Sequence, residues 1–189
     1  MIQVRLAAPR RAARVTGLIL GAALLRVLLL PASDLFSTIV FAGCLLAISW
    51  FEQPSASIER RWGRGRAIVI GLMVGAILLA PVVSGPLSAR PWGAFWAWAA
   101  IAALVATLEE TSIRGVLYQR WASEAGTVAA ILVGAAVFAL IHLPRYGIGA
   151  MPLDAAVGLA LGGLRALTGR VLPCAVAHTV ADWGAWFWA

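Results

Sequence analysis

Residues 92–114 have the sequence WGAFWAWAAIAALVATLEETSIR, an apolar stretch that ends in two acids and an arginine. An α-helix needs about 20 mainly apolar residues to cross the hydrocarbon core of a bilayer, and this stretch has that length. Ionisable side chains at such a depth cost several kcal/mol each unless they are paired, so they indicate function by default. The stretch therefore predicts a transmembrane helix in which Glu109, Glu110 and Arg114 have a functional use.

Apolar stretches recur along almost the whole chain of 189 residues, which is 62% hydrophobic and only 12% charged. A mean hydropathy of +0.91 excludes a soluble globular domain. We therefore expect an all-α fold, a polytopic transmembrane helix bundle of about seven spans that forms a single membrane domain over residues 1–189. The predicted spans are residues 15–31, 35–51, 67–84, 92–113, 127–143, 151–168 and 171–188.

The fifteen basic residues are all arginine, and they flank the apolar stretches without forming a continuous basic stripe. A membrane topology signal explains the net charge of +7 better than nucleic-acid binding does. With the N-terminus inside, twelve arginines lie on the cytoplasmic side and only Arg90 and Arg145 lie outside. We expect a multi-pass integral membrane protein with a cytoplasmic N-terminus and an external C-terminus, in a bacterial cell membrane.

Other features of the apolar stretches also suggest membrane helices. The first stretch carries Arg26 and no clear small-x-small cleavage site, which favours an uncleaved helix over a removable signal peptide. Cys44 and Cys174 fall inside apolar stretches, so we expect small buried side chains rather than a disulfide or metal ligands. Small residues predict close helix packing in two spans. They are Gly71, Gly75, Gly158, Gly162 and Gly163.

The two adjacent glutamates are expected to differ in their surroundings. Glu110 and Arg114 are four residues apart and face each other on a helix, whereas Glu109 points about 100° away around the helix axis. Glu109 is thus left without a counter-ion in its own helix, which suits a general base in an apolar cavity. Taken alone, residues 109–114 support an alternative equally well, in which both acids and Arg114 form one buried network.

Both histidines of the chain lie in later spans. His142 follows Phe138 by four residues, and His178 precedes Asp182 by four, so each pair shares a helix face. A histidine at a helix end is more often hydrogen-bonded than catalytic, and a His–Asp pair can simply stabilise its helix. Three such segments nevertheless occur together in one small bundle: residues 109–114, 138–142 and 178–182. Their joint occurrence indicates a functional site.

Two kinds of chemistry suit these residues. Glu109, His142 and His178 satisfy the ligand count of a catalytic zinc site, although no H-E-x-x-H motif is present. Without metal, Glu109 and His142 would deprotonate a water while His178 and Asp182 polarise a carbonyl. Asp182 would then have to be protonated, or act through His178 or a water, because a carboxylate repels an oxyanion. The sequence favours no cofactor and leaves zinc open.

The three blocks resemble the motifs of the CPBP family of intramembrane proteases, the CAAX prenyl endopeptidase or Abi-like proteins. The resemblance rests on the acid pair with Arg114, on residues 138–142 and on residues 178–182, and it is supported by residues 158–173 before the last block. It covers residues 92–189, the expected catalytic core, whereas residues 1–91 would form variable N-terminal spans.

The resemblance implies an intramembrane endopeptidase that hydrolyses a peptide bond of a membrane-associated, lipid-modified or C-terminally tagged protein. It assigns water activation to Glu109 and His142, the oxyanion side to His178 and Asp182, and support to Glu110 and Arg114. Many relatives have Asn where this chain has Asp182. The alternative is a non-catalytic immunity factor or small transporter that keeps buried polar residues.

The acids of the fourth span can meet His142 only if they lie at the same depth in the membrane. If the fourth span ended near Glu110, that residue would lie at the opposite membrane surface from His142. Either this helix continues to about Trp121, or His142 lies deeper than the expected boundaries place it. Because Ile113, Val116 and Leu117 extend the apolar pattern, we favour the longer helix.

Overall fold

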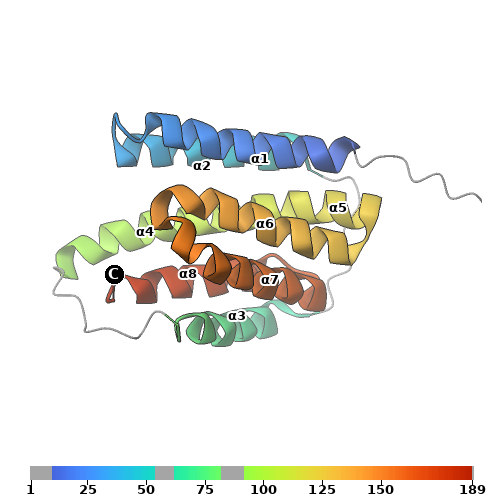
Figure 1. The fold of residues 1–189 in the computed structure, drawn as a ribbon. Helices are drawn as coiled ribbons and strands as arrows, with labels where there is room; N and C mark the ends of the chain where they lie inside the picture. Colours follow the sequence, from blue (N-terminus) through green and yellow to red (C-terminus); the bar gives the residue numbers. More distant parts are fainter. Residues whose placement is uncertain (1–9, 54–61, 82–91, 189) are drawn as a thin grey trace, which may run out of the picture.

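The computed structural model describes residues 10–53, 62–81 and 92–188, and these residues contain helices and no strand (Figure 1). The predicted all-helical class is confirmed. The helices are α1 (Arg10–Leu29), α2 (Asp34–Phe51), α3 (Arg64–Leu78), α4 (Trp92–Glu110), η1 (Thr111–Leu117), α5 (Tyr118–Ala125), α6 (Thr127–Tyr146), the short η2 (Ile148–Ala150), α7 (Met151–Thr168) and α8 (Leu172–Ala185).

Four helical segments of the described chain are long and apolar enough to cross a membrane: α1, α2, α6 and the segment Ile148–Thr168. Their outward faces are apolar, as lipid contact requires; Leu28 and Ile39, for example, are 67% and 59% exposed. A helical membrane bundle is thus confirmed. With 15 and 14 residues, α3 and α8 are shorter than the predicted spans, and residues 82–84 lie outside the described part.

The fourth span continues far beyond Glu109 and Glu110, as we expected from the position of His142. α4, η1 and α5 follow one another without a break from Trp92 to Ala125, and η1 has π-helical backbone. A π-helical insertion is rare and is often found at a functional site. The helix ends at Gly126, whose φ of 89° favours glycine and lets α6 begin directly afterwards.

Glycines bring two helix pairs into close contact. A Cβ atom on Gly71 or Gly75 of α3 would lie within 2.8 Å of α8 atoms, and one on Gly158 of α7 would lie 2.7 Å from Ala135 of α6. Gly162 also faces α6, but nothing lies within 4 Å of a Cβ on Gly163. The packing role predicted for Gly163 is therefore wrong, because that residue points away from the neighbouring helices.

The bundle has α1 and α2 along one side and α3 along the opposite side, with the other helices between them (Figure 1). The core joins the α1–α2 pair to η1 through Val15, Ile19, Phe41, Leu45 and Ile113, all fully buried. Cys174 is buried as predicted, Cys44 is half-buried, and both are free thiols. This packing places η1, in the middle of the long helix, against α1, α2, α6 and α7, and it places α4 against α8.

Candidate active site

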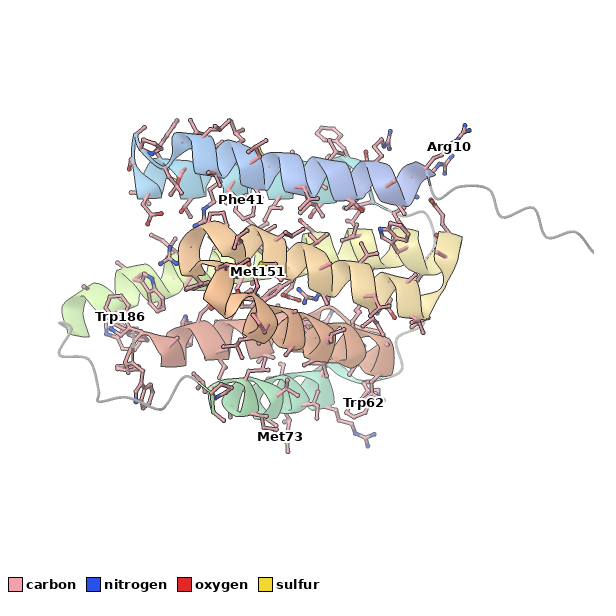
Figure 2. All side chains as sticks on the ribbon, viewed as in Figure 1. Arg10, Phe41, Trp62, Met73, Met151 and Trp186 are labelled. Carbon is pink, nitrogen blue, oxygen red and sulfur yellow. The ribbon has the colours of Figure 1, made fainter. Side chains whose placement is uncertain are left out.

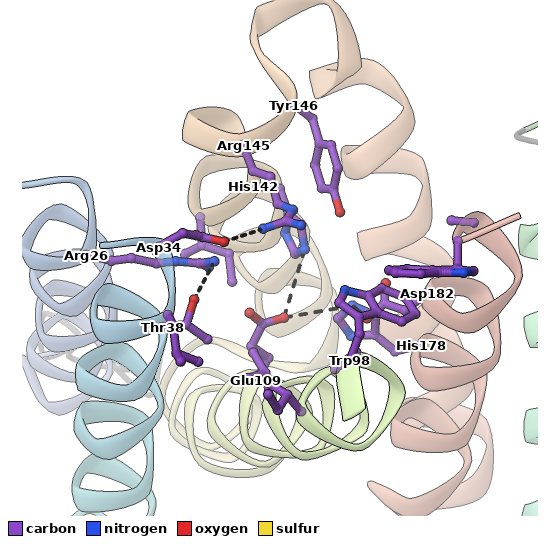
Figure 3. A pocket seen from close by; sticks show the side chains of 17 residues that line it. Arg26, Asp34, Thr38, Trp98, Glu109, His142, Arg145, Tyr146, His178 and Asp182 are labelled. Carbon is purple, nitrogen blue, oxygen red and sulfur yellow. Dashed lines mark hydrogen bonds and ion pairs between the residues drawn. The ribbon is translucent and has the colours of Figure 1, made fainter. Parts of the chain in front are cut away.

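A cavity of about 340 Å³ lies where α1, α2, α4, α6 and α8 meet, and Glu109, His142, His178 and Asp182 all line it (Figure 3). Glu109 comes from the last turn of α4, His142 from the last turns of α6, and the other two from α8. Because α4 continues into η1, Glu109 lies within a continuous helix and reaches the level of His142. The fold thus brings together four residues that are up to 73 positions apart in the sequence.

The contacts of His142 determine which ring nitrogen faces the cavity. Its Nδ1 lies 2.8 Å from the carbonyl oxygen of Phe138, and because a carbonyl only accepts, Nδ1 carries the hydrogen. In the neutral ring Nε2 then has a free lone pair, and it lies 3.9 Å from Oε2 of Glu109. That distance is too long for a direct hydrogen bond, but a water about 2.8 Å from each atom can bridge it.

His178 is held from behind by the second glutamate. Its Nδ1 lies 3.0 Å from Oε1 of Glu110, and its Nε2 lies 3.8 Å from both Oε2 of Glu109 and Oδ2 of Asp182. The ring therefore presents Nε2 to the cavity, opposite His142. Since 3.8 Å is beyond hydrogen-bond range, the direct bond between His178 and Asp182 considered from the sequence is not formed.

Glu110 and Arg114 form a fully buried ion pair. Oε1 of Glu110 lies 2.8 Å from Nη1 of Arg114, and the two side chains are 0% and 1% exposed. Arg114 also donates to the carbonyl oxygen of Gly158 at 3.2 Å, and its guanidinium lies over the ring of Phe138. The pair survives the π-helical backbone of η1 and connects the long helix to α6, α7 and, through His178, to α8.

The two glutamates consequently have different surroundings, as their helical positions predicted. Glu110 is joined to a guanidinium and an imidazole by short contacts, whereas the ion-pair contacts of Glu109 among the described residues are two histidine nitrogens at 3.8 and 3.9 Å. The single buried network of both acids and Arg114 is therefore incomplete: it contains Glu110, and Glu109 instead faces the cavity.

Phe138 and Arg165 support this arrangement. The ring of Phe138 packs against His142 and His178, with centroids 4.2 and 5.2 Å apart. Arg165 was counted among the cytoplasmic arginines, but it is 2% exposed and donates through Nε to the carbonyl oxygen of Arg114 at 2.8 Å. Its guanidinium also lies over the ring of Tyr118, so it stabilises the η1–α5 junction.

Several cavity residues were not found by sequence reasoning, because they come from helices without a recognisable motif. Arg26 had one signal, a charge inside an apolar stretch. The lining also includes residues of the mouth, of which Asp34 pairs with Arg145 at 3.9 Å. The missed residues are Arg26, Asp34, Thr38, Trp98, Arg145, Tyr146 and Trp186.

Glu109, His142 and His178 can together hold a metal ion, since one ligand atom from each lies within 4.8 Å of the others. Tetrahedral zinc with bonds of 2.0–2.1 Å needs ligand atoms about 3.3 Å apart, so a modest contraction of the three side chains suffices. The Nδ1 contacts of both histidines, to a carbonyl and to a carboxylate, are of the kind that orients metal-binding imidazoles. The donor set thus fits zinc as well as a metal-free site.

A membrane helix bundle whose cavity holds a glutamate between two histidines defines a candidate hydrolase of the membrane interior. The model of the Rce1-like family, the type II CAAX prenyl endopeptidases, matches residues 90–184, half of the chain. The chain belongs to this family of CAAX-type intramembrane proteases, and the resemblance stated from the sequence is confirmed. Neither a curated protein nor a solved structure matches the chain significantly.

Proposed function

We propose that this protein is an intramembrane endopeptidase in which Glu109 and His142 activate the attacking water. The supporting observation is the 3.9 Å gap between Oε2 of Glu109 and Nε2 of His142, the nitrogen whose lone pair is free in the neutral ring. Two acceptors at this separation suit a water molecule that must lose a proton as it attacks.

The reaction then follows from the arrangement of the side chains. Glu109 takes a proton from the water, and the oxygen forms a bond to the scissile carbonyl carbon. His178 in its protonated form, held through Nδ1 by Glu110, donates Nε2–H to the resulting oxyanion. The tetrahedral intermediate collapses as the C–N bond breaks, and the proton on Glu109 passes to the departing amine. Asp182 belongs to the oxyanion side of the site. It stabilises the oxyanion either directly in its protonated form, or indirectly through His178 or through a water.

The proposed substrate is a membrane-associated protein or peptide that is lipid-modified or carries a C-terminal tag. The family description names CAAX prenyl endopeptidases, and the cavity lining includes the apolar side chains of Ile101, Val105 and Ile141, which a lipid anchor can contact. The test is cleavage of an S-farnesylated CAAX peptide and of a transmembrane C-terminal tail by purified protein in nanodiscs. The alternative is a non-catalytic immunity factor or transporter. Such a protein would cleave neither substrate, and it would keep its function after Glu109→Gln.

We also propose the orientation of the bundle, with the N-terminus in the cytoplasm. Of the twelve arginines assigned to the cytoplasmic side, Arg114 and Arg165 are buried, which leaves ten against two. Arg5, Arg60, Arg61 and Arg90 lie outside the described residues. Arg10 and Trp62 mark one end of the bundle and Trp186 lies towards the other (Figure 2). The cavity, lined by Trp186, then belongs to the outer half of the membrane.

Reporter fusions check this orientation. Alkaline phosphatase, which is active only outside the cytoplasm, is expected to be inactive when fused at Gly63 and active when fused after Ala189. A β-galactosidase fusion at the same two positions, active only inside, serves as the control for expression. The reverse pattern would contradict both the orientation and the outward position of the cavity.

Metal dependence is a separate expectation. Because the chain has no H-E-x-x-H motif and places the acid and histidines on three helices, we expect cleavage that does not require zinc. Activity should persist after exhaustive chelation, and elemental analysis should find no stoichiometric metal. Loss of activity with chelator and its return with zinc would instead make Glu109, His142 and His178 a metal site.

A further inference from the structure

Tyr146 is the last residue of α6, and it lines the cavity one helical turn beyond His142. Because side chains on a helix lean towards its N-terminus, the ring of Tyr146 lies against the ring of His142. The two rings are stacked, with their centroids 5.8 Å apart and an angle of 8° between their planes. This contact orients the phenol, and Figure 3 shows its hydroxyl end pointing into the cavity, between His142 and Asp182.

The hydrogen of this hydroxyl can be donated to a ligand. The phenol oxygen interacts with the guanidinium of Arg145, and because a guanidinium only donates hydrogen bonds, the oxygen is the acceptor in this contact. A cation that donates to the oxygen polarises the O–H bond, so it strengthens the hydroxyl as a donor. Tyr146 is also 53% exposed, which leaves it accessible to a molecule in the cavity.

The oxyanion side of the site needs a second donor. His178 donates through Nε2, but Asp182, whose Oδ2 lies 3.8 Å from that nitrogen, can only accept hydrogen bonds when it is ionised. Enzymes that cleave acyl bonds typically aim two donors at the oxyanion. The Tyr146 hydroxyl faces this part of the cavity, since it interacts electrostatically with both Asp182 and Glu109.

We propose that Tyr146 is a further catalytic residue, whose hydroxyl donates a hydrogen bond to the oxyanion of the tetrahedral intermediate beside Nε2–H of His178. The inference rests on the endopeptidase function proposed above and adds a donor that acts whether or not Asp182 is protonated. The proton stays on the phenol oxygen throughout the reaction. Water activation is left to Glu109 and His142.

The first test is Tyr146→Phe, which keeps the ring against His142 and removes only the hydroxyl. In nanodiscs, with whichever of the two substrates above the wild type cleaves, kcat should fall about 10²–10³-fold, the usual cost of removing one oxyanion donor. KM and melting temperature should stay close to wild type. The matched control is Tyr118→Phe, at the other tyrosine of the chain, which lies outside the cavity lining and keeps its ring under Arg165. It should cleave normally.

A binding measurement separates this inference from the proposed function. The probes are two S-farnesylated CAAX peptides in which the scissile amide is replaced by a tetrahedral phosphonate anion or by a neutral ketomethylene group. Trp98 and Trp186 line the cavity, so tryptophan fluorescence reports binding without cleavage. Tyr146→Phe should weaken phosphonate binding about 10–100-fold, the range of a hydrogen bond to a charged group, and leave ketomethylene binding unchanged. If this pattern appeared while wild type cleaved neither substrate, the proposed function would fail and Tyr146 would still be the anion donor of the cavity.

Three results would overturn the inference. Full activity of Tyr146→Phe would do so, and loss of activity in Tyr146→Leu alone would then assign the residue to stacking on His142. Phosphonate binding that Tyr146→Phe leaves unchanged would remove the hydroxyl from the oxyanion side. Equal weakening of phosphonate and ketomethylene binding would make Tyr146 an interfacial tyrosine that shapes the cavity.

Discussion

Glu109→Gln is expected to reduce cleavage by about 10²–10⁴-fold, the usual contribution of a general base, while the protein remains folded. The amide keeps the size and shape of the carboxylate but cannot take a proton from water. Stability should be close to that of wild type because the nearest ion-pair partners of Glu109 are two histidine nitrogens at 3.8 and 3.9 Å. The measurement is peptide cleavage together with the melting temperature in detergent.

Glu124→Gln is the matched control for this variant. Glu124 lies in α5, and its carboxylate accepts a hydrogen bond from the backbone of Ala12, which an amide oxygen can also accept. This change should leave both cleavage and melting temperature unaltered. Normal cleavage by Glu109→Gln would show that Glu109 is not the general base.

Glu110→Gln is expected to act mainly on stability. It leaves the buried guanidinium of Arg114 without its anion, and breaking a buried ion pair in this way typically costs about 3–5 kcal/mol. Cleavage should fall as well, because the charged partner that orients His178 is lost. The melting temperature of the detergent-solubilised protein should drop by several degrees, a change that Glu109→Gln does not produce.

A double variant tests the cause of this loss. Combining Glu110→Gln with Arg114→Gln removes both charges, so its melting temperature should lie closer to wild type than the sum of the two single losses predicts. Cleavage should stay low because His178 still lacks its carboxylate partner. If Glu110→Gln proved stable but inactive while Glu109→Gln cleaved normally, the roles of the two glutamates would have to be exchanged.

Much of the candidate site was visible in the sequence because its side chains are costly in a membrane. Acids and histidines inside apolar stretches are few, and the spacing of four residues places Glu110 beside Arg114 and His142 beside Phe138 wherever the backbone is helical. The requirement that Glu109 reach the level of His142 also predicted the long fourth helix, which runs unbroken through residue 125.

Other features depend on contacts between helices, which no local sequence pattern specifies. The π-helical backbone of η1 and the 3.8 Å separation between His178 and Asp182 depend on how the helices pack. Helix packing also corrected two sequence-based interpretations. Arg165 was counted as a cytoplasmic arginine but is buried, and Gly163 was expected at a helix contact but points away from its neighbours. In an all-apolar helix the hydrophobic pattern does not mark which face meets a neighbour, because lipid and protein interior are equally apolar.

The sequence by itself determined the fold class and the family, because hydropathy and motif order are local properties, and the helical spacing indicated that Glu110 faces Arg114. Only the tertiary structure decided that Glu110 holds His178 from behind and that His142 turns Nε2 towards Glu109. It also brought Arg26 of α1 into the same cavity, 83 positions before Glu109 in the chain. These relations join separate helices, and their distances depend on how closely the helices pack, which the order of residues along each helix does not specify.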